Sequence, residues 1–397
     1  MSTSTNATIR LDTCPGCGGR ELVRLYDIPW ERIVPVWMCS QCGLVFQRTP
    51  LTGEELDHYY RANSTFHFHG PGSRQERLMQ ARHAFLGNVL NELQVSRPRV
   101  LDVGCGFGDF LASFDQGRWD RVGIELNSER AAYARNRFRL QISEKTLETS
   151  GIKPHSVDLL CGFGLIEHFH AIREFLAAVH LALAPGGLGC FSVADLANPD
   201  HGVSDYFSVE HILYFTQHTL ESLVVAAGFT PLHTGPLTPP DYKDIACLFR
   251  KELEEFDWRG MRPVPAEVQR IRETIEVYAQ QRFDFIRRLR DRLSAAGLFD
   301  DGLQIGIYGA GGHTEQLLDG IPELRAVTIF FDSDPQKHGR PFLCGTVYDP
   351  AAIARLGLDA VIISTRAFEE EIMAAISPIT PPGMRMVPLY GHFEEIQ

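Results

Sequence analysis

Short apolar runs alternate with segments of helical periodicity through the middle of the chain. Runs bounded by turn residues predict buried strands, whereas apolar residues recurring every three to four positions predict amphipathic helices. We therefore expect strands at residues 100–103, 122–126, 140–143, 157–164, 188–193 and 245–249, and helices at 73–95, 128–138 and 219–227. Strands alternating with helices predict an α/β fold with a mostly parallel sheet. The Pro-, Thr- and Gly-rich residues 231–244 predict a loop over a substrate cleft.

The same alternation returns near the end of the chain. Residues 304–308, 327–331 and 360–364 predict strands, and a glycine-rich turn follows the first of them. Apolar residues from Val268 to Leu293 share one helical face and predict a long spacer helix that ends at Gly297. We expect four parts: residues 1–50, a domain at 51–250 that includes an N-terminal connector, a spacer helix at 251–297, and a second α/β domain at 298–397.

Composition and charge narrow the function classes. The chain has 397 residues, 44% of them hydrophobic, and a formal net charge of −12. The acidic balance opposes a nucleic-acid-binding surface, and no apolar run approaches the length of a membrane span. The polar N-terminal residues lack the apolar core of a signal peptide. We expect a cytoplasmic protein with a small-molecule substrate, and no nucleic-acid or membrane partner.

Two C-x-x-C pairs near the N-terminus indicate a metal site. Cys14 and Cys17 form the first pair, and Cys39 and Cys42 form the second. Four thiolates complete a closed tetrahedral zinc site without an open position for catalysis, and the short strands expected at residues 36–38 and 44–46 are typical of a zinc ribbon. A redox role would need a single C-x-x-C near a βαβ unit. We therefore expect one structural zinc per chain.

The glycine loop after the strand at residues 100–103 is the main candidate for cofactor binding. Gly104, Gly106 and Gly108 allow a sharp turn and a close approach of a ligand to the backbone, and Asp102 precedes them. A dinucleotide site would have G-x-G-x-x-G and a diphosphate at the helix start, which Asp109 opposes. An acid suits a cationic ligand without phosphate. The stretch resembles the cofactor loop of class I methyltransferases, which bind S-adenosylmethionine; the other interpretation is a glycine turn that binds nothing.

Further cofactor residues follow from position and from this resemblance. Glu125 ends the next strand, where a carboxylate can accept both hydroxyls of a ribose. The resemblance implies that the backbone after the third strand lies against adenine and that the fourth strand ends near the methionine part. Glu167 and His168 are placed near the cofactor without a catalytic role. The predicted cofactor residues are Asp102, Gly104, Gly106, Gly108, Glu125, Leu126, Thr146, Leu147, Phe163 and Gly164.

The order of the modules narrows the resemblance. A four-cysteine ribbon, a class I methyltransferase core, a Glu-His run before Tyr-Phe and a C-terminal Rossmann-like domain occur together in sugar C-methyltransferases. That resemblance implies methylation of a nucleotide-linked 4-keto deoxysugar, with His211 as the base beside Glu210. The tyrosine that the family has in this run is Ser208 here, so Tyr206 and Tyr214 are the candidates to stabilise an enolate. An O-methyltransferase would use the same histidine without an enolate donor.

The remaining candidates concern the substrate. Tyr59 and Tyr60 lie in an aromatic stretch that either lines a substrate pocket or anchors the ribbon. The C-terminal glycine run resembles nucleotide-sugar-binding domains, which implies Gly311 and His313 as substrate contacts; a structural duplicate remains an equal alternative. An NAD site with Asp332 on the ribose is the weaker interpretation, because Thr314 stands where the third glycine should be. A zinc-ribbon RNA methyltransferase and a non-catalytic cofactor-binding scaffold are the other function classes.

Overall fold

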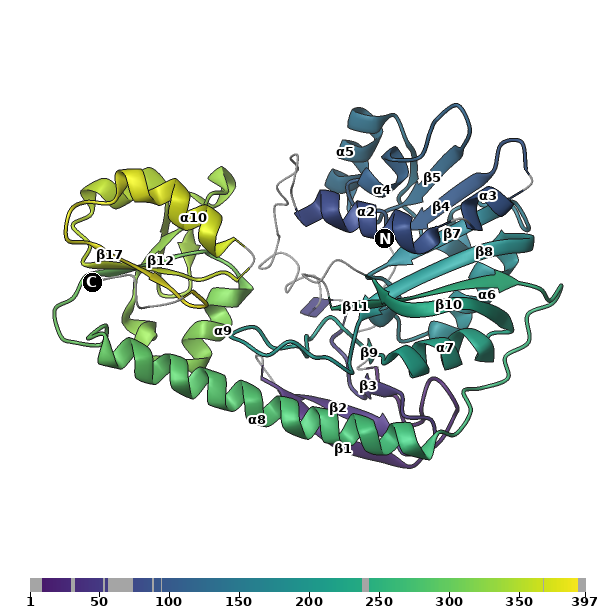
Figure 1. Ribbon diagram of the computed structural model, residues 1–397, viewed down its shortest axis with the longest axis horizontal. Helices are drawn as coiled ribbons and strands as arrows, with labels where there is room; N and C mark the ends of the chain where they lie inside the picture. Colours follow the sequence, from purple (N-terminus) through teal and green to yellow (C-terminus); the bar gives the residue numbers. More distant parts are fainter. Residues whose placement is uncertain are drawn as a thin grey trace. The chain divides into compact units, whose positions relative to one another are not determined.

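The computed structural model describes residues 9–29, 33–52, 54–55, 74–87, 89–93, 95–237, 243–366 and 368–391. They fall into two compact units, which we describe separately (Figure 1). The first holds the two C-x-x-C pairs and the larger sheet and extends to Val277, and the second holds Asp200–Tyr206 and the chain from Tyr278 onward. Within the described residues, we find no helix with the length and apolarity needed to span a bilayer.

A seven-stranded sheet forms the centre of the first unit. Its order is β10-β11-β8-β7-β4-β5-β6, in which β8, β7, β4, β5 and β6 are parallel and β11 is antiparallel to both of its neighbours, β8 and β10. The strands are β4 (Arg99–Val103), β5 (Asp120–Ile124), β6 (Gln141–Ser143), β7 (Val157–Phe163), β8 (Leu183–Ala194), β10 (Phe229–Leu237) and β11 (Asp244–Lys251). The α/β prediction for this part is confirmed.

One element of this sheet was predicted wrongly. Residues 231–237, expected in a loop over a cleft, belong to β10, which pairs along its length with β11. The prolines that suggested a loop are Pro231 and Pro236, and β10 is an edge strand of the sheet. Proline is tolerated there because an edge strand leaves one row of N–H groups outside the ladder.

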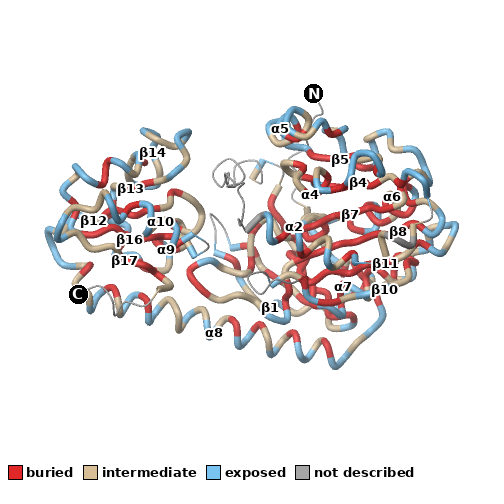
Figure 2. Tube along the Cα trace, turned by 45° about the horizontal axis from the view of Figure 1, so that its top comes forward, coloured by how far each residue is buried: buried red, intermediate tan, exposed pale blue. Residues whose placement is uncertain are grey.

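Helices cover both faces of this sheet. Successive residues of each strand point to opposite sides, and apolar side chains on both sides pack against helices. Val100, Leu159 and Cys161 pack with residues of α2, α4 and α5, whereas Leu101 and Leu160 pack with α6 and α7. Figure 2 shows the strands buried between these layers. The helices are α2 (Arg74–Leu86), α3 (Val89–Glu92), α4 (Asp109–Ala112), α5 (Ser128–Phe138), α6 (Ile172–Ala182) and α7 (Gln217–Ala226), with short 3-10 turns η1 (Leu147–Thr149) and η2 (Ile166–His168).

The cysteine module, residues 9–29 and 33–50, carries three strands of a smaller sheet. These are β1 (Leu22–Ile28), β2 (Val34–Cys39) and β3 (Val45–Gln47). The fourth strand is β9 (Leu213–Tyr214), which comes from the chain between β8 and α7 and pairs antiparallel with β3. Leu44 and Phe46 also pack in the same apolar cluster as α6 and α7. The module therefore shares both a sheet and a core with the rest of the first unit.

The second unit has its own six-stranded sheet, of order β14-β15-β13-β12-β16-β17. Its strands are β12 (Ile305–Tyr308), β13 (Ile329–Phe331), β14 (Pro341–Phe342), β15 (Gly345–Tyr348), β16 (Ala360–Ile363) and β17 (Arg385–Pro388). Its helices include α9 (Gly312–Gly320) and α10 (Glu369–Ile376). The predicted long helix is α8 (Pro265–Ala295), which begins later than the expected span of 251–297 and belongs to the first unit up to Val277 and to the second from Tyr278. Asp205 belongs to the second unit, since its Oδ1 accepts a hydrogen bond from Tyr278 Oη at 2.6 Å.

Candidate functional site

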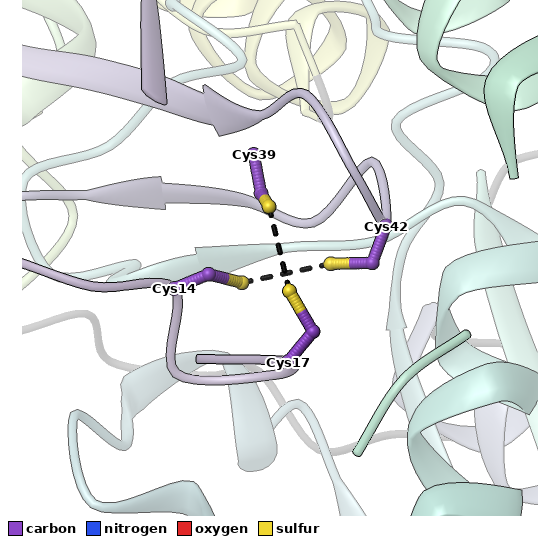
Figure 3. A group of neighbouring side chains, drawn as sticks. All are labelled: Cys14, Cys17, Cys39 and Cys42. Carbon is purple, nitrogen blue, oxygen red and sulfur yellow. Dashed lines mark hydrogen bonds between the residues drawn. The ribbon is translucent and has the colours of Figure 1, made fainter. Parts of the chain in front are cut away.

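The four cysteines of the module converge on one point (Figure 3). Cys14 Sγ lies 3.5 Å from Cys42 Sγ, and Cys17 Sγ lies 3.5 Å from Cys39 Sγ. All four sulfur atoms are within 4.8 Å of one another. A tetrahedral site with Zn–S bonds of about 2.3 Å places its sulfur atoms roughly 3.8 Å apart, so the spacing suits such an ion.

The glycine loop after β4 is built by backbone conformations that side chains avoid. Gly104, Gly106 and Gly108 have φ of +72°, +55° and +83°. A Cβ on Gly108 would lie 2.7 Å from Leu140 Cδ1, so close helix packing also requires glycine there. A Cβ on Gly106 would meet no atom within 4 Å, so the loop is open at that residue. The loop therefore combines a tight turn with room for a ligand.

Glu125, at the end of β5, is buried and fixed by the backbone. Its Oε2 accepts a hydrogen bond from Gly106 N at 2.9 Å, and its Oε1 accepts one from Asn127 N at 2.8 Å. A carboxylate has about four lone-pair sites, so roughly two remain after these bonds. One carboxylate thus supports the glycine loop, holds the start of α5 and keeps capacity for two ligand hydroxyls.

The other predicted cofactor residues lie at the carboxyl ends of neighbouring strands. Thr146 follows β6 and Gly164 follows β7; both are exposed, as is Leu126 after β5, whose side chain is 62% exposed. Leu147 and Phe163 are buried. The sheet order reverses between β4 and β7, and open α/β sheets bind ligands at the carboxyl ends of strands flanking such a reversal.

Asp102 is buried at the end of β4. Burial raises the pKa of this carboxyl to about 7, and nearby Glu125 adds to the rise while Arg82 opposes it. A cationic ligand would favour the ionised form. The arrangement can therefore exchange a proton for a positively charged ligand near neutral pH.

A second cluster, which we call the histidine cluster, consists of Glu167, His168 and His211. One potential metal-ligand atom from each residue lies within 4.8 Å of the others. The two imidazole rings are 5.0 Å apart and nearly perpendicular. His168 Nδ1 lies 3.0 Å from the carbonyl oxygen of Glu210, and Glu210 precedes His211. The chain after β7 and the segment before β9 therefore meet here.

Burial keeps the histidine cluster uncharged. It lowers the pKa of His211 to about 4, with a smaller contribution from His168 that Glu210 opposes. It also lowers the pKa of His168 and raises that of Glu167 to about 8. Among the described residues, Glu167 Oε2 is buried without a hydrogen-bond partner. At neutral pH the cluster holds two imidazoles that can accept a proton.

The amino-acid sequence matches known methyltransferases over the part that carries both arrangements. A methyltransferase domain family matches residues 72–234. A probable S-adenosylmethionine-dependent methyltransferase of Mycolicibacterium smegmatis is 26% identical over 206 residues, which are 50% of this chain and 74% of that protein. The chain contains an S-adenosylmethionine-dependent methyltransferase domain.

Other similar proteins act on different substrates. The ubiquinone biosynthesis O-methyltransferase of Psychrobacter arcticus is 25% identical over 172 residues, which cover 37% of this chain and 66% of that protein. Among solved structures, the CurJ carbon methyltransferase is 14% identical with a TM-score of 0.38, and covers 45% of this chain and 55% of its own. Burkholderia thailandensis 1,6-didemethyltoxoflavin-N1-methyltransferase, with bound S-adenosylhomocysteine, is 20% identical with a TM-score of 0.40, over 58% and 99% of the two chains.

The predicted catalytic residues of the methyltransferase occupy different positions. His211 and Glu210 are at the histidine cluster, and Ser208 Oγ donates a hydrogen bond to Glu210 Oε2. Tyr214 is buried in β9, and its hydroxyl donates to Ser208 O at 2.8 Å. Tyr206 belongs to the second unit, where its N–H donates to Tyr278 Oη at 2.7 Å. The catalytic role of each residue stays a prediction.

The sequence reasoning did not assign catalytic roles to Glu167 and His168, although it named both. The signal was available in their position, because residues just after a central parallel strand lie at the edge where ligands bind. The sequence does not show that these residues lie next to His211, because they come together only when the segment before β9 folds back onto η2.

The predicted substrate residues fall outside the described residues or in the second unit. Tyr59 and Tyr60 lie outside the described residues. The ring nitrogens of His313 lie 2.8 Å from Ser364 Oγ and 2.8 Å from Tyr390 Oη, so both have partners within the unit. Gly311 precedes α9, and a Cβ there would meet nothing within 4 Å. Contact of Gly311 and His313 with a substrate stays a prediction.

The second unit offers little for an NAD site. The carboxylate of Asp332, which an NAD site would use for the ribose, already accepts three hydrogen bonds. Its Oδ2 accepts from Ala310 N at 3.0 Å and Lys337 Nζ at 2.9 Å, and its Oδ1 accepts from Asp334 N at 2.9 Å. Lys337 Nζ also donates to Ala310 O at 2.9 Å. The lysine therefore engages both the acid and the glycine turn that a dinucleotide would contact.

Proposed function

We propose that this methyltransferase methylates a sugar, at the carbon beside the keto group of a nucleotide-linked 4-keto deoxysugar. His211 is the base that removes the proton from that carbon. The observation that carries the proposal is the histidine cluster, which places a neutral imidazole next to the segment after β7. The sugar itself is suggested by the resemblance of the module order to sugar C-methyltransferases.

Different residues of the chain would bind the cofactor and remove the proton. S-Adenosylmethionine, when bound, supplies an electrophilic methyl group on a sulfonium. Glu125 would accept the ribose hydroxyls, Asp102 would face its positive charge, and the glycine loop would let it approach the backbone. His211 takes the proton, and the electron pair left on the carbon forms the new bond to the methyl group. The positive charge of the sulfonium would be replaced by that of protonated His211, so charge and atoms would balance.

We propose further that the cysteine module holds one structural zinc ion. The spacing of the four sulfur atoms supports this, as does the turn geometry that presents them. Gly18 and Gly43, which follow the second and fourth cysteines, have φ of +78° and +77°, and Gly19 N donates to Cys17 Sγ at 3.3 Å. Backbone N–H groups aimed at sulfur stabilise thiolate ligands.

Methylation of a sugar hydroxyl is the second candidate. It needs a base but no donor to stabilise an enolate, and the geometry favours it in one respect. The hydroxyls nearest to His211 along its segment, those of Ser208 and Tyr214, both donate to other protein groups. Methylation of an oxygen would therefore need only the base, whereas methylation of a carbon would also need a hydrogen-bond donor for the enolate.

A labelled methyl-transfer assay tests the proposal. S-Adenosylmethionine with a deuterated methyl group is offered to nucleotide-linked 4-keto and 4-hydroxy deoxysugars, and carbon NMR locates the label. We expect label on a ring carbon, with His211→Gln about 100-fold slower or worse because a general base is lost. The matched control, His218→Gln, changes an exposed histidine of α7. Label on oxygen would favour the second candidate, and absence of label from every sugar would refute both.

A further inference from the structure

We propose that Gln47, at the end of β3 in the cysteine module, is a positioning residue for His211. The inference rests on the proposed function, since it concerns the segment that carries the proposed base. That segment, residues 208–214, contains no helix, and its only regular element is the short strand β9.

Gln47 lies at the centre of a group of acceptors that all belong to this segment. Its Nε2 lies 2.8 Å from Ser208 O, 2.7 Å from His211 O and 3.3 Å from Val209 O. The Tyr214 hydroxyl oxygen is a fourth neighbour, at 3.3 Å. An amide nitrogen carries two hydrogens, so the two shortest contacts, to the carbonyls of Ser208 and His211, take them best. One side chain thereby ties both ends of the turn that holds His211.

The backbone of the same residue adds a further bond. Gln47 N donates to Ile212 O at 2.8 Å, and Gln47 is completely buried. Buried carbonyl groups need partners. Gln47 is the cysteine module's donor to the carbonyls of His211 and Ile212, and it shares the carbonyl of Ser208 with the Tyr214 hydroxyl and with His211 N. The turn is therefore held in place by a residue far away in the sequence.

The opposite side of the turn is held by the methyltransferase core. Ile212 N donates to Glu167 O at 2.7 Å, and His168 Nδ1 contacts Glu210 O at 3.0 Å. The segment is thus clamped between η2 and β3. Loss of either side would let His211 move relative to Glu167 and His168.

The choice of glutamine points to this role. Its Oε1 is buried and, among the described residues, has no hydrogen-bond partner. An apolar side chain of similar length would fill the same space without burying an unpaired oxygen. The residue is therefore best explained by its two N–H donors.

The test follows the ionisation of His211, which depends on its position. The groups near its ring are His168 and Glu167 from η2, and Glu210 and Tyr214 from its own segment. Gln47 contacts the backbone carbonyl of His211 and not its ring. In the wild-type protein, NMR of ¹⁵N-histidine-labelled full chain should show His211 titrating near pH 4. Its signal is assigned by its loss in His211→Gln. The measurement needs no substrate, so its outcome does not depend on which acceptor is methylated.

Gln47→Met keeps the length and apolar volume but removes both donors. We expect the midpoint of His211 to rise by roughly one pH unit or more, because a released turn exposes the ring to water. His180, whose pKa is also lowered to about 4 but which contacts Leu253 O, should not change. The control Gln269→Met, at an exposed position of α8, should leave both histidines unchanged.

An unchanged midpoint for His211 in folded Gln47→Met would overturn the proposal. If that variant does not fold, Tyr214→Phe serves instead, since it removes the hydroxyl that donates to Ser208 O. It should shift the midpoint of His211 in the same direction by a smaller amount, and no shift would again overturn the proposal. Loss of methyl transfer in His211→Gln tests the proposed base separately.

Discussion

Glu125→Gln is the substitution that most directly tests the cofactor site. The carboxylate accepts hydrogen bonds from Gly106 N and Asn127 N, one on each oxygen. Glutamine keeps one acceptor oxygen but places an NH₂ group where the other was. That group cannot accept from a backbone N–H and faces a donor instead. The substitution therefore weakens the glycine loop and removes half of the capacity for ribose hydroxyls.

The magnitude follows from the bonds that change. Hydrogen bonds to charged groups contribute about 1.5–3 kcal/mol and neutral ones about 0.5–1.5 kcal/mol. The substitution removes one acceptor oxygen and turns the bonds to the other from charged into neutral ones. We expect it to cost about 1–3 kcal/mol of the free energy of S-adenosylmethionine binding, which is a roughly 5- to 150-fold rise in Kd. Isothermal titration calorimetry with S-adenosylmethionine measures it directly. Urea unfolding of the empty protein should show a loss of similar size, since the two backbone bonds exist without ligand.

The control is Glu129→Gln, which makes the same chemical change at an exposed position of α5. It should alter neither Kd nor stability by more than a few tenths of a kcal/mol. If folded Glu125→Gln binds S-adenosylmethionine as tightly as the wild type, the cofactor does not use this carboxylate. The assignment of the loop would then be refuted.

Three further predictions concern a proton, a glycine and the cysteines. Because the pKa of Asp102 is about 7, S-adenosylmethionine should bind more tightly as pH rises from 6 to 8, and its binding should release a proton. Calorimetry in buffers of different ionisation enthalpy measures that proton, and Asp102→Asn should abolish the pH dependence. Gly108→Ala should lower the free energy of unfolding in urea by about 2–4 kcal/mol, because alanine there has both a positive φ and too little space. Gly106→Ala has the positive φ but open space, so it should lower that free energy by about 1–2 kcal/mol, and equal losses in the two variants would contradict the reasoning. Cys39→Ser should remove about one zinc per chain by metal analysis, and a wild-type protein without zinc would refute the site.

The sequence was sufficient where local patterns determine the outcome. The helix expected at residues 128–138 is α5 (Ser128–Phe138), since Asn127 caps it and Arg139, with φ of +54°, ends it. The pattern failed at β10 because Pro231, Gly235 and Pro236 disfavour a strand locally, whereas its pairing with β11 is a tertiary property. The same holds for the histidine cluster. His168 and His211 are separated by α6 and the long strand β8, and only the fold places their rings together.

The pairing of β3 with β9 also bears on how the chain can be made. Gln47 and Tyr214, which meet at this pairing, are separated by 167 residues. During synthesis the cysteine module emerges before β9, so the edge of β3 stays without its neighbour until most of the methyltransferase core has been translated. Closing so long a loop is slow, and an unpaired strand edge invites association with other chains. The N-terminal module alone is therefore a poor candidate for separate expression, and transplanting it onto another core would require residues 208–214 to travel with it.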